Sequence, residues 1–274
     1  MFGQKLSYIL ILLIFLFSFS CSKKEVEVPN IKKKSQELEM SIAYKEALDK
    51  LEINDTYNAA QKFLEAELLF PQSSWAPQSA LMASYSYYVQ NYYSEAVSNL
   101  NRFLKTYPKN ENVVYAHYLI GICYYEMIED EKRDINPILK SKEKFELILK
   151  NYPNTDFALD SKFKLDLIND ILASKEMYLA RHYQKKNKWI AAINRYNIVV
   201  QNYNETIFIE EALHRLVEIN YQLGLIEQSE KYAKVLGYNY QSSEWYKKSY
   251  KIFNQDYSLK TAKIDKPKKK GVIK

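Results

Sequence analysis

The stretch SEAVSNLNRFLKTYP, residues 94–108, decides the fold of this chain. Counting back from Pro108, a small residue stands at twelve residues, a large apolar residue at eight and another apolar residue at five: Ala96, Leu100 and Phe103. Side chains that are spaced by four and three residues lie on one face of an α-helix. The stretch therefore predicts an amphipathic helix that ends at a Tyr-Pro pair.

The same pattern returns three more times and closes at Phe70-Pro71, Tyr152-Pro153 and Tyr203-Asn204. The counted residues are Ala59, Phe63 and Ala66; Ser141, Phe145 and Ile148; and Ala192, Tyr196 and Val199. A second helical stretch precedes each copy and carries its own small residue, at Ala47, Ser84, Gly121 or Ala180. Helix-turn-helix units that recur in this way resemble the tetratricopeptide repeat, in which small residues let paired helices approach closely.

We therefore expect an all-α fold, a tetratricopeptide-repeat solenoid of about five helix-turn-helix repeats from about residue 34 to residue 255. The fifth unit fits loosely, with Ser229 at the place of the alanine and Val217 where a small residue is expected. Two departures from the regular spacing are informative. The segment EDEKRDINP, residues 129–137, adds a loop to the third repeat, and the first helix of the fourth repeat is expected from about Asp156 to Gln184.

The N-terminus carries an apolar run from Leu6 to Phe19 that, at about 14 residues, is shorter than the roughly 20 needed to cross a bilayer. A lysine before the run and small residues after it are typical of a signal peptide, residues 1–20. The run stops at Cys21, and a signal cut before a cysteine resembles the bacterial lipoprotein signal, in which the thiol is acylated. Residues 21–39 would then be a lipidated tether. An ordinary secretory signal with an incidental cysteine is the alternative.

The formal charge of +6 is concentrated at the C-terminus. Residues 260–274 hold seven lysines and one aspartate, a net charge of 7 − 1 = +6. Without these residues and Lys5, 39 − 8 = 31 basic residues face 33 − 1 = 32 acidic ones. The body of the protein is therefore near neutral, and we expect no nucleic-acid groove. Residues 256–274 are predicted to be a basic flexible tail.

Catalytic motifs are missing from the sequence. The chain has no GxGxxG, GxxxxGK, HExxH or GxSxG pattern, and His117, His182 and His214 are far apart in the sequence. Cys123 stands in the apolar stretch LIGICYYEM and is expected to fill the core. We therefore predict that this chain is not an enzyme and that it holds neither a metal nor another cofactor.

Three longer phrases carry a more specific likeness: YAHYLIGICYYEMI (115–128), ILKNYPNTDFALDSK (148–162) and MYLARHYQKKNKWIAAINRYNIVVQNYNET (177–206). They resemble the BamD family, tetratricopeptide-repeat lipoproteins of the outer-membrane β-barrel assembly machinery, the BAM complex. The likeness runs from about residue 40 to residue 240. Ser22 agrees with it, because an Asp at that position holds many lipoproteins in the inner membrane.

The resemblance implies a non-catalytic subunit that is anchored by lipid at the periplasmic face of the outer membrane. Its implied partners are unfolded outer-membrane β-barrel proteins, the POTRA domain of BamA and other BAM lipoproteins. The alternative is another periplasmic repeat lipoprotein, such as a pilotin or a scaffold linked to the Tol-Pal system. Pilotins have a more regular repeat spacing, and the Tol-Pal relative carries an N-terminal coiled coil for which residues 23–40 are too short.

In a tetratricopeptide solenoid, fixed positions of each first helix line the concave face. These positions are aromatic or apolar in repeats one to three, residues 40–155, and charged in repeats four and five, residues 156–255. They include Tyr44, Lys45, Tyr85, Tyr88, Tyr115, Tyr118, Arg181, His214, Arg215 and Glu218. We predict that Tyr85, Tyr88, Tyr115 and Tyr118 contact an extended peptide, because aromatic rings combine contact area with a hydrogen-bonding tip. Packing against neighbouring helices is the alternative for some of them.

Arg195 is the predicted docking residue. It stands one residue before Tyr196 in the repeat register, which places it on the second helix of the fourth repeat and away from the concave face. An arginine can hold a carboxylate through two parallel hydrogen bonds. The resemblance implies that the arginine of this NR pair contacts the POTRA domain of BamA.

Overall fold

The structure is a computed structural model that describes residues 30–129 and 134–254. The predicted signal peptide, Cys21 with residues 22–29 of the tether, and the basic tail lie outside the described residues. Within them the chain forms helices and no strand. The helices are α2 (Asn30–Glu52), α3 (Thr56–Leu69), α4 (Trp75–Val89), α5 (Tyr93–Thr106), α6 (Val113–Glu126), α7 (Asn136–Asn151), α8 (Asp156–Lys185), α9 (Trp189–Asn202), α10 (Ile209–Gln222), α11 (Ile226–Asn239) and α12 (Glu244–Phe253). The all-α prediction is confirmed.

The repeat register is also confirmed. Ala96, Leu100 and Phe103 of α5 are fully buried, and so are the residues at the same places of α3, α7 and α9. The aromatic residue that was predicted to close each copy lies directly after a helix. At Tyr107 its backbone N–H donates to the carbonyl of Phe103, 2.8 Å away, and completes the last turn. One amphipathic pattern therefore produces four equivalent second helices.

Small residues let the two helices of a repeat come close together. A Cβ atom on Gly121 of α6 would lie 2.8 Å from Cε1 of Phe145 on α7, and the hydroxyl of Ser141 donates to the Gly121 carbonyl at 2.9 Å. In the fifth repeat, the hydroxyl of Ser229 donates to the Val217 carbonyl at 2.8 Å. The loosely matching fifth unit therefore keeps the same helix-to-helix bond.

The chain divides into two compact units, and the first ends at Ala83. In this unit α2 packs against α3. Ala47, Ala59, Phe63 and Ala83 form one buried cluster, which joins the first half of α4 to the pair. The small side chains of the three alanines leave room for the ring of Phe63 between the helices.

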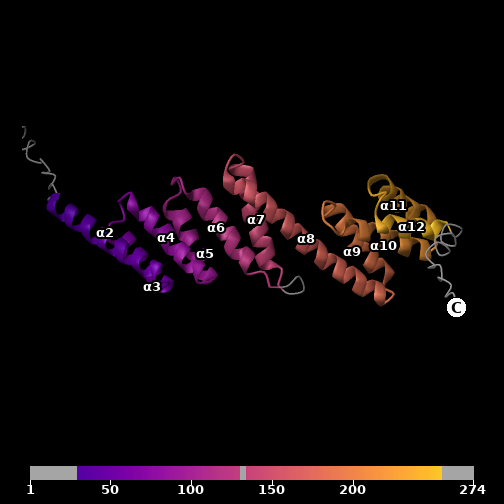
Figure 1. The fold of residues 1–274 in the computed structure, drawn as a ribbon, viewed down its shortest axis with the longest axis horizontal. Coiled ribbons are helices and arrows are strands. Elements are labelled where there is room, and N and C mark those ends of the chain that lie inside the picture. The colour runs from indigo at the N-terminus through magenta and orange to yellow at the C-terminus, as the bar shows by residue number, and fades with distance from the viewer. Residues whose placement is uncertain (1–29, 130–133, 255–274) are drawn as a thin grey trace, which may run out of the picture. The chain divides into compact units, whose positions relative to one another are not determined.

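The second unit begins at Ser84, and in it each helix from α5 to α11 packs against the next helix of the chain (Figure 1). α8 has 30 residues and is about 45 Å long. Leu165 and Ile168 of its first half lie in one buried cluster, and Met177 and Ala180 of its second half lie in another. The predicted long helix is therefore confirmed to within one residue, and it connects the cores of repeats three and four.

α12 follows the fifth repeat and packs against α10 and α11. The hydroxyl of Ser243 accepts a hydrogen bond from the backbone N–H of Tyr246, and this bond caps the start of the helix. Among the residues that the structure describes, no helix is both long and apolar enough to cross a bilayer.

Candidate functional site

The structure brings the four predicted tyrosines together within the second unit. Tyr85 and Tyr88 of α4 have ring centroids 6.3 Å apart. The rings of Tyr115 and Tyr118 on α6 both contact Phe157 of α8, at 5.8 and 5.1 Å. Burial, together with the nearby phenols of Tyr85 and Tyr88, raises the pKa of Tyr115 to about 12. The predicted cluster is thus one aromatic surface formed by α4 and α6.

The members of this cluster differ in how much they are already engaged. Tyr85 is exposed, whereas Tyr88, Tyr115 and Tyr118 are half-buried. The phenol of Tyr118 donates a hydrogen bond of 2.7 Å to Oδ2 of Asp160 on α8. Burial and this bond raise the pKa of Tyr118. The ring of Tyr118 also lies 6.1 Å from the buried ring of Phe145, as the packing alternative anticipated, and Tyr85 is the most exposed of the four tyrosines.

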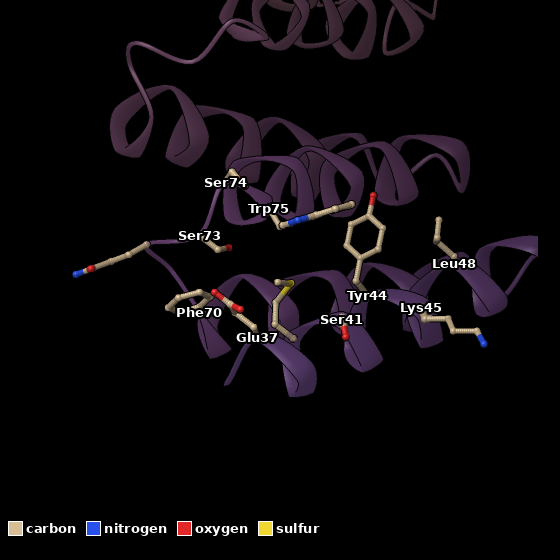
Figure 2. A pocket seen from close by; sticks show the side chains of 11 residues that line it. Glu37, Ser41, Tyr44, Lys45, Leu48, Phe70, Ser73, Ser74 and Trp75 are labelled. Atoms are coloured by element: carbon tan, nitrogen blue, oxygen red, sulfur yellow. The ribbon is translucent and has the colours of Figure 1, made fainter. Parts of the chain in front are cut away.

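A groove of about 720 Å³ lies in the first unit, between α2 and the segment that connects α3 to α4 (Figure 2). Its apolar lining consists of Met40, Tyr44, Leu48, Phe70 and Trp75, and its polar lining of Glu37, Ser41, Lys45, Gln72, Ser73 and Ser74. Tyr44 stands edge-on to the ring of Trp75, with centroids 5.5 Å apart. Burial raises the pKa of Tyr44, and a side-chain hydrogen bond with Gln78 partly offsets this rise.

Sequence reasoning identified only part of this groove. Tyr44 and Lys45 were predicted from the repeat register, but Phe70 and Trp75 were not. Phe70 was recognised only as the end of the first repeat, and Trp75 is the first residue of the next helix. The sequence did contain a signal for this groove: an aromatic residue stands at each end of the connection between α3 and α4.

The charged residues of the last two repeats bind one another. The guanidinium of Arg181 donates two hydrogen bonds to the carboxylate of Glu211, at 3.1 and 2.6 Å. Arg215 donates to Glu218 at 2.9 Å and lies over the ring of Trp245. Burial acts to raise the pKa of the Glu211 carboxyl, but Arg181 and Arg215 together hold it below its ordinary value.

His214 is a correction to the predicted groove. The register placed it on the concave face, but the side chain is buried, with Nδ1 2.9 Å from Oγ of Ser249 on α12. Its ring also lies 5.2 Å from that of Trp245. α12 is the reason, because it packs on the face of α10 that an uncapped repeat would leave open.

Arg195 lies on α9, as predicted, and forms an ion pair with Glu176 of α8. Its Nη1 donates to the two carboxylate oxygens of Glu176 at 2.9 and 3.3 Å. The arginine side chain is 37% exposed and the glutamate side chain 17% exposed. The guanidinium therefore joins two helices and still reaches the surface.

Two other kinds of site were considered among the described residues, a metal centre and a reactive cysteine. No group of three or more His, Cys, Asp and Glu side chains within them could hold a metal ion. Cys123 is buried, and burial raises the pKa of its thiol to about 12, which leaves it protonated at neutral pH. The prediction that this cysteine fills the core is confirmed.

Comparison with known families decides the family. The model of YfiO, described as an outer membrane lipoprotein, matches residues 36–236. The chain belongs to the YfiO family. The match includes every predicted site residue except Cys21, and it ends before α12 and the basic tail.

Three curated relatives of this chain carry the same name. A protein of Rickettsia prowazekii is 41% identical over 223 residues, which are 81% of this chain and 89% of the relative. A protein of Caulobacter vibrioides is 36% identical over 81% of this chain and 72% of the relative. A third, from Neisseria meningitidis serogroup A, is 29% identical over 76% and 82%. All three are named outer membrane protein assembly factor BamD. The predicted resemblance to the BamD family is therefore confirmed.

Proposed function

We propose that this chain is a non-catalytic outer membrane protein assembly factor of the BAM complex. In this role its N-terminal repeats bind unfolded β-barrel proteins, and its fourth and fifth repeats dock on the POTRA domain of BamA, beside other BAM lipoproteins. Lipid at Cys21 would hold the protein at the periplasmic face of the outer membrane. The family match and the name of the relatives support the assembly role.

The groove in the first unit is the observation that carries the binding role. Barrel strands are extended, alternate apolar and polar residues, and end in an aromatic residue and a carboxylate. The rings of Tyr44 and Trp75 provide apolar contact at little cost in side-chain entropy. Lys45, Ser73 and Ser74 at the same groove provide a cation and hydroxyls for a terminal carboxylate. Shape and chemistry therefore suit the end of an unfolded barrel strand.

The first prediction tests this groove with a peptide that copies the last strand of a barrel protein. Trp75→Ala is expected to weaken peptide binding at least tenfold, because aromatic anchors at the centre of an interface commonly contribute 2 kcal/mol or more, roughly. Tyr57→Ala is the matched control: Tyr57 lies in the same unit outside the groove and is 49% exposed, against 52% for Trp75. Calorimetric titration gives both affinities.

Thermal melting of both variants separates lost binding from lost structure. A Trp75→Ala chain that melts normally and binds the peptide as tightly as the unchanged chain would show that the groove is not the binding site. In that case, the same titration on Tyr85→Ala, with Tyr118→Ala in the same chain, tests the tyrosine cluster of the second unit.

A further inference from the structure

One face of α8 exposes an apolar stripe. Leu159, Phe163 and Leu167 are spaced by four residues, so they lie above one another on the same side of the helix. Their exposed fractions are 62%, 60% and 48%, although α8 packs against α7 and α9 on its other sides. Ile207, which is also exposed, lies beside the end of the stripe, because its backbone N–H donates to Asp170 at 3.4 Å. This helix face has apolar side chains without a cover among the described residues.

Carboxylates border the stripe along its length. Asp156, Asp160, Asp166 and Asp170 each stand three residues from one of the apolar side chains, which makes them neighbours on the helix surface. Two lysines lie nearby on α8, but Lys164 points to another helix, where its Nζ stands 4.6 Å from the centre of the Tyr125 ring. Lys162 is the remaining cation. Asp160 is engaged in the same way, because it accepts the hydrogen bond of Tyr118 on α6. Without Lys164 and Asp160, the net charge around the stripe is 1 − 3 = −2.

The charge of this face argues against a lipid surface as its cover. Bacterial and other anionic headgroups would be repelled by the aspartates. The complementary occupant is a segment with clustered cations and a few apolar side chains. Such a segment exists in the chain itself: KIDKPKKKGVIK, residues 263–274, has six lysines, one aspartate and the apolar residues Ile264, Val272 and Ile273.

We propose that the basic C-terminal segment, residues 263–274, docks in cis on the acidic apolar face of α8. Its lysines pair with the aspartates, and its apolar residues cover Phe163 and Leu167. Both partners belong to the unit that starts at Ser84. The segment lies beyond residues 36–236, which the family model matches.

The length of the chain permits the contact. α12 packs on α10, α10 on α9 and α9 on α8, and three helix spacings of 8–10 Å amount to about 30 Å. The position of Leu167 along α8 adds about 10 Å, because it precedes the region that packs with α9 by a few residues. Twenty residues follow Asn254, and an extended chain reaches about 40 Å by residue 266 and roughly 65 Å by Lys274. The distal half of the tail can therefore reach the stripe.

Linkage favours the chain's own tail over that of a second copy. A short connection within one chain gives an effective concentration of about 1 mM, far above a micromolar protein concentration. The chain's own tail is therefore expected to occupy this face in preference to the tail of a second copy.

Carbodiimide crosslinking of the full chain tests the proposal, because this reagent joins a lysine amine to a carboxylate only where the two already touch. An equal mixture of ordinary and ¹⁵N-labelled chains is crosslinked, and the linked peptides are identified by mass. We expect links between residues 263–274 and Asp156, Asp160, Asp166 or Asp170, with both halves carrying the same label. The yield should fall when the salt concentration is raised to about 1 M, where screening acts beyond about 3 Å.

Two paired variants make the outcome decisive. Phe163→Ser with Leu167→Ser is expected to lower the yield of these links about tenfold, since the lost apolar cover weakens docking. Ile190→Ser with Leu225→Ser replaces two comparably exposed apolar residues elsewhere in the unit and should leave the yield unchanged. Links that spread evenly over the acidic residues of the chain, or a yield that is insensitive to the first pair, would overturn the proposal. Links of mixed label would show that the tail of a second copy is the occupant.

Discussion

At the scale of single residues, side chains that the repeat register directs to a surface also hold helices together. Arg195 joins α9 to α8 through Glu176, and Tyr118 joins α6 to α8 through Asp160. A partner that binds one of these residues must therefore either leave its internal bond in place or replace it. Variants at these positions therefore need a control that removes the internal bond alone.

Arg195→Leu is expected to weaken co-purification with BamA at least tenfold. Truncating a charge that is desolvated against a partner carboxylate costs about 2–5 kcal/mol, whereas an exposed ion pair contributes only about 0–1 kcal/mol. Glu176→Gln is the matched control, because it removes the same internal ion pair and leaves the guanidinium in place. If both variants lose BamA equally, Arg195 acts by holding α9 on α8 and does not contact the partner.

Gly121→Ala is expected to destabilise the chain by about 1 kcal/mol. A Cβ at this position would stand 2.8 Å from the buried Phe145 ring, and overpacking of a full core costs about 1–3 kcal/mol, from which the better helix propensity of alanine subtracts up to about 1 kcal/mol. Urea unfolding measures the change. Adding Phe145→Leu in the same chain should recover part of the loss; a double variant whose losses simply add would refute the steric explanation.

At the scale of elements, α12 changes the chemistry of the helix that it covers. It buries His214, and burial lowers the pKa of this histidine from 6.5 to about 4. Glu218 raises this pKa, and Arg215 and Lys248 lower it, but burial is the largest influence. In the unfolded chain this histidine therefore takes up a proton near pH 6.5, whereas in the folded chain it takes up the proton only near pH 4.

The free energy of unfolding should consequently fall as the pH falls from about 6.5 to about 4, and stay level above that range. At pH 5 the loss relative to pH 7 is about 2 kcal/mol, from 1.36 kcal/mol per pH unit over the interval below the unfolded pKa. Urea unfolding at the two pH values measures it. His214→Gln should remove the part of the loss that this histidine causes, whereas His182→Gln, at an exposed position of α8, should retain it. Burial also lowers the pKa of His117, which therefore adds to the loss in both variants.

At the scale of the whole molecule, the attachment to the membrane is predicted to depend on one atom outside the described residues, Sγ of Cys21. Each buried methylene of an acyl chain contributes about 0.8 kcal/mol, so two or more chains hold a protein stably on a bilayer. Cys21→Ser is expected to move the protein from the membrane fraction to the soluble periplasm in cells that lack its partners. Cys123→Ser, which changes only a buried thiol, should remain with the membranes.

The sequence by itself determined the helices, their pairing and the family. Helix periodicity is a local property, so Ala96, Leu100 and Phe103 could be assigned to a buried face, and the bounds of α8 could be predicted, without any knowledge of distant contacts. The same register placed the four tyrosines on one surface, which the structure confirms as a cluster. Periodicity repeated four times was sufficient because each repeat needs only its neighbour to bury its core.

Only the tertiary structure decided which of these side chains remain available. The bond from Tyr118 to Asp160 joins residues 42 positions apart, and the ion pair of Arg195 joins residues 19 apart. No local pattern in the chain connects such residues, because their distance depends on how one helix is placed on the next. The burial of His214 by α12 and the groove between Tyr44 and Trp75 arise in the same way. The residues of a helix determine which of its faces is apolar, whereas the packing of other helices determines what covers that face.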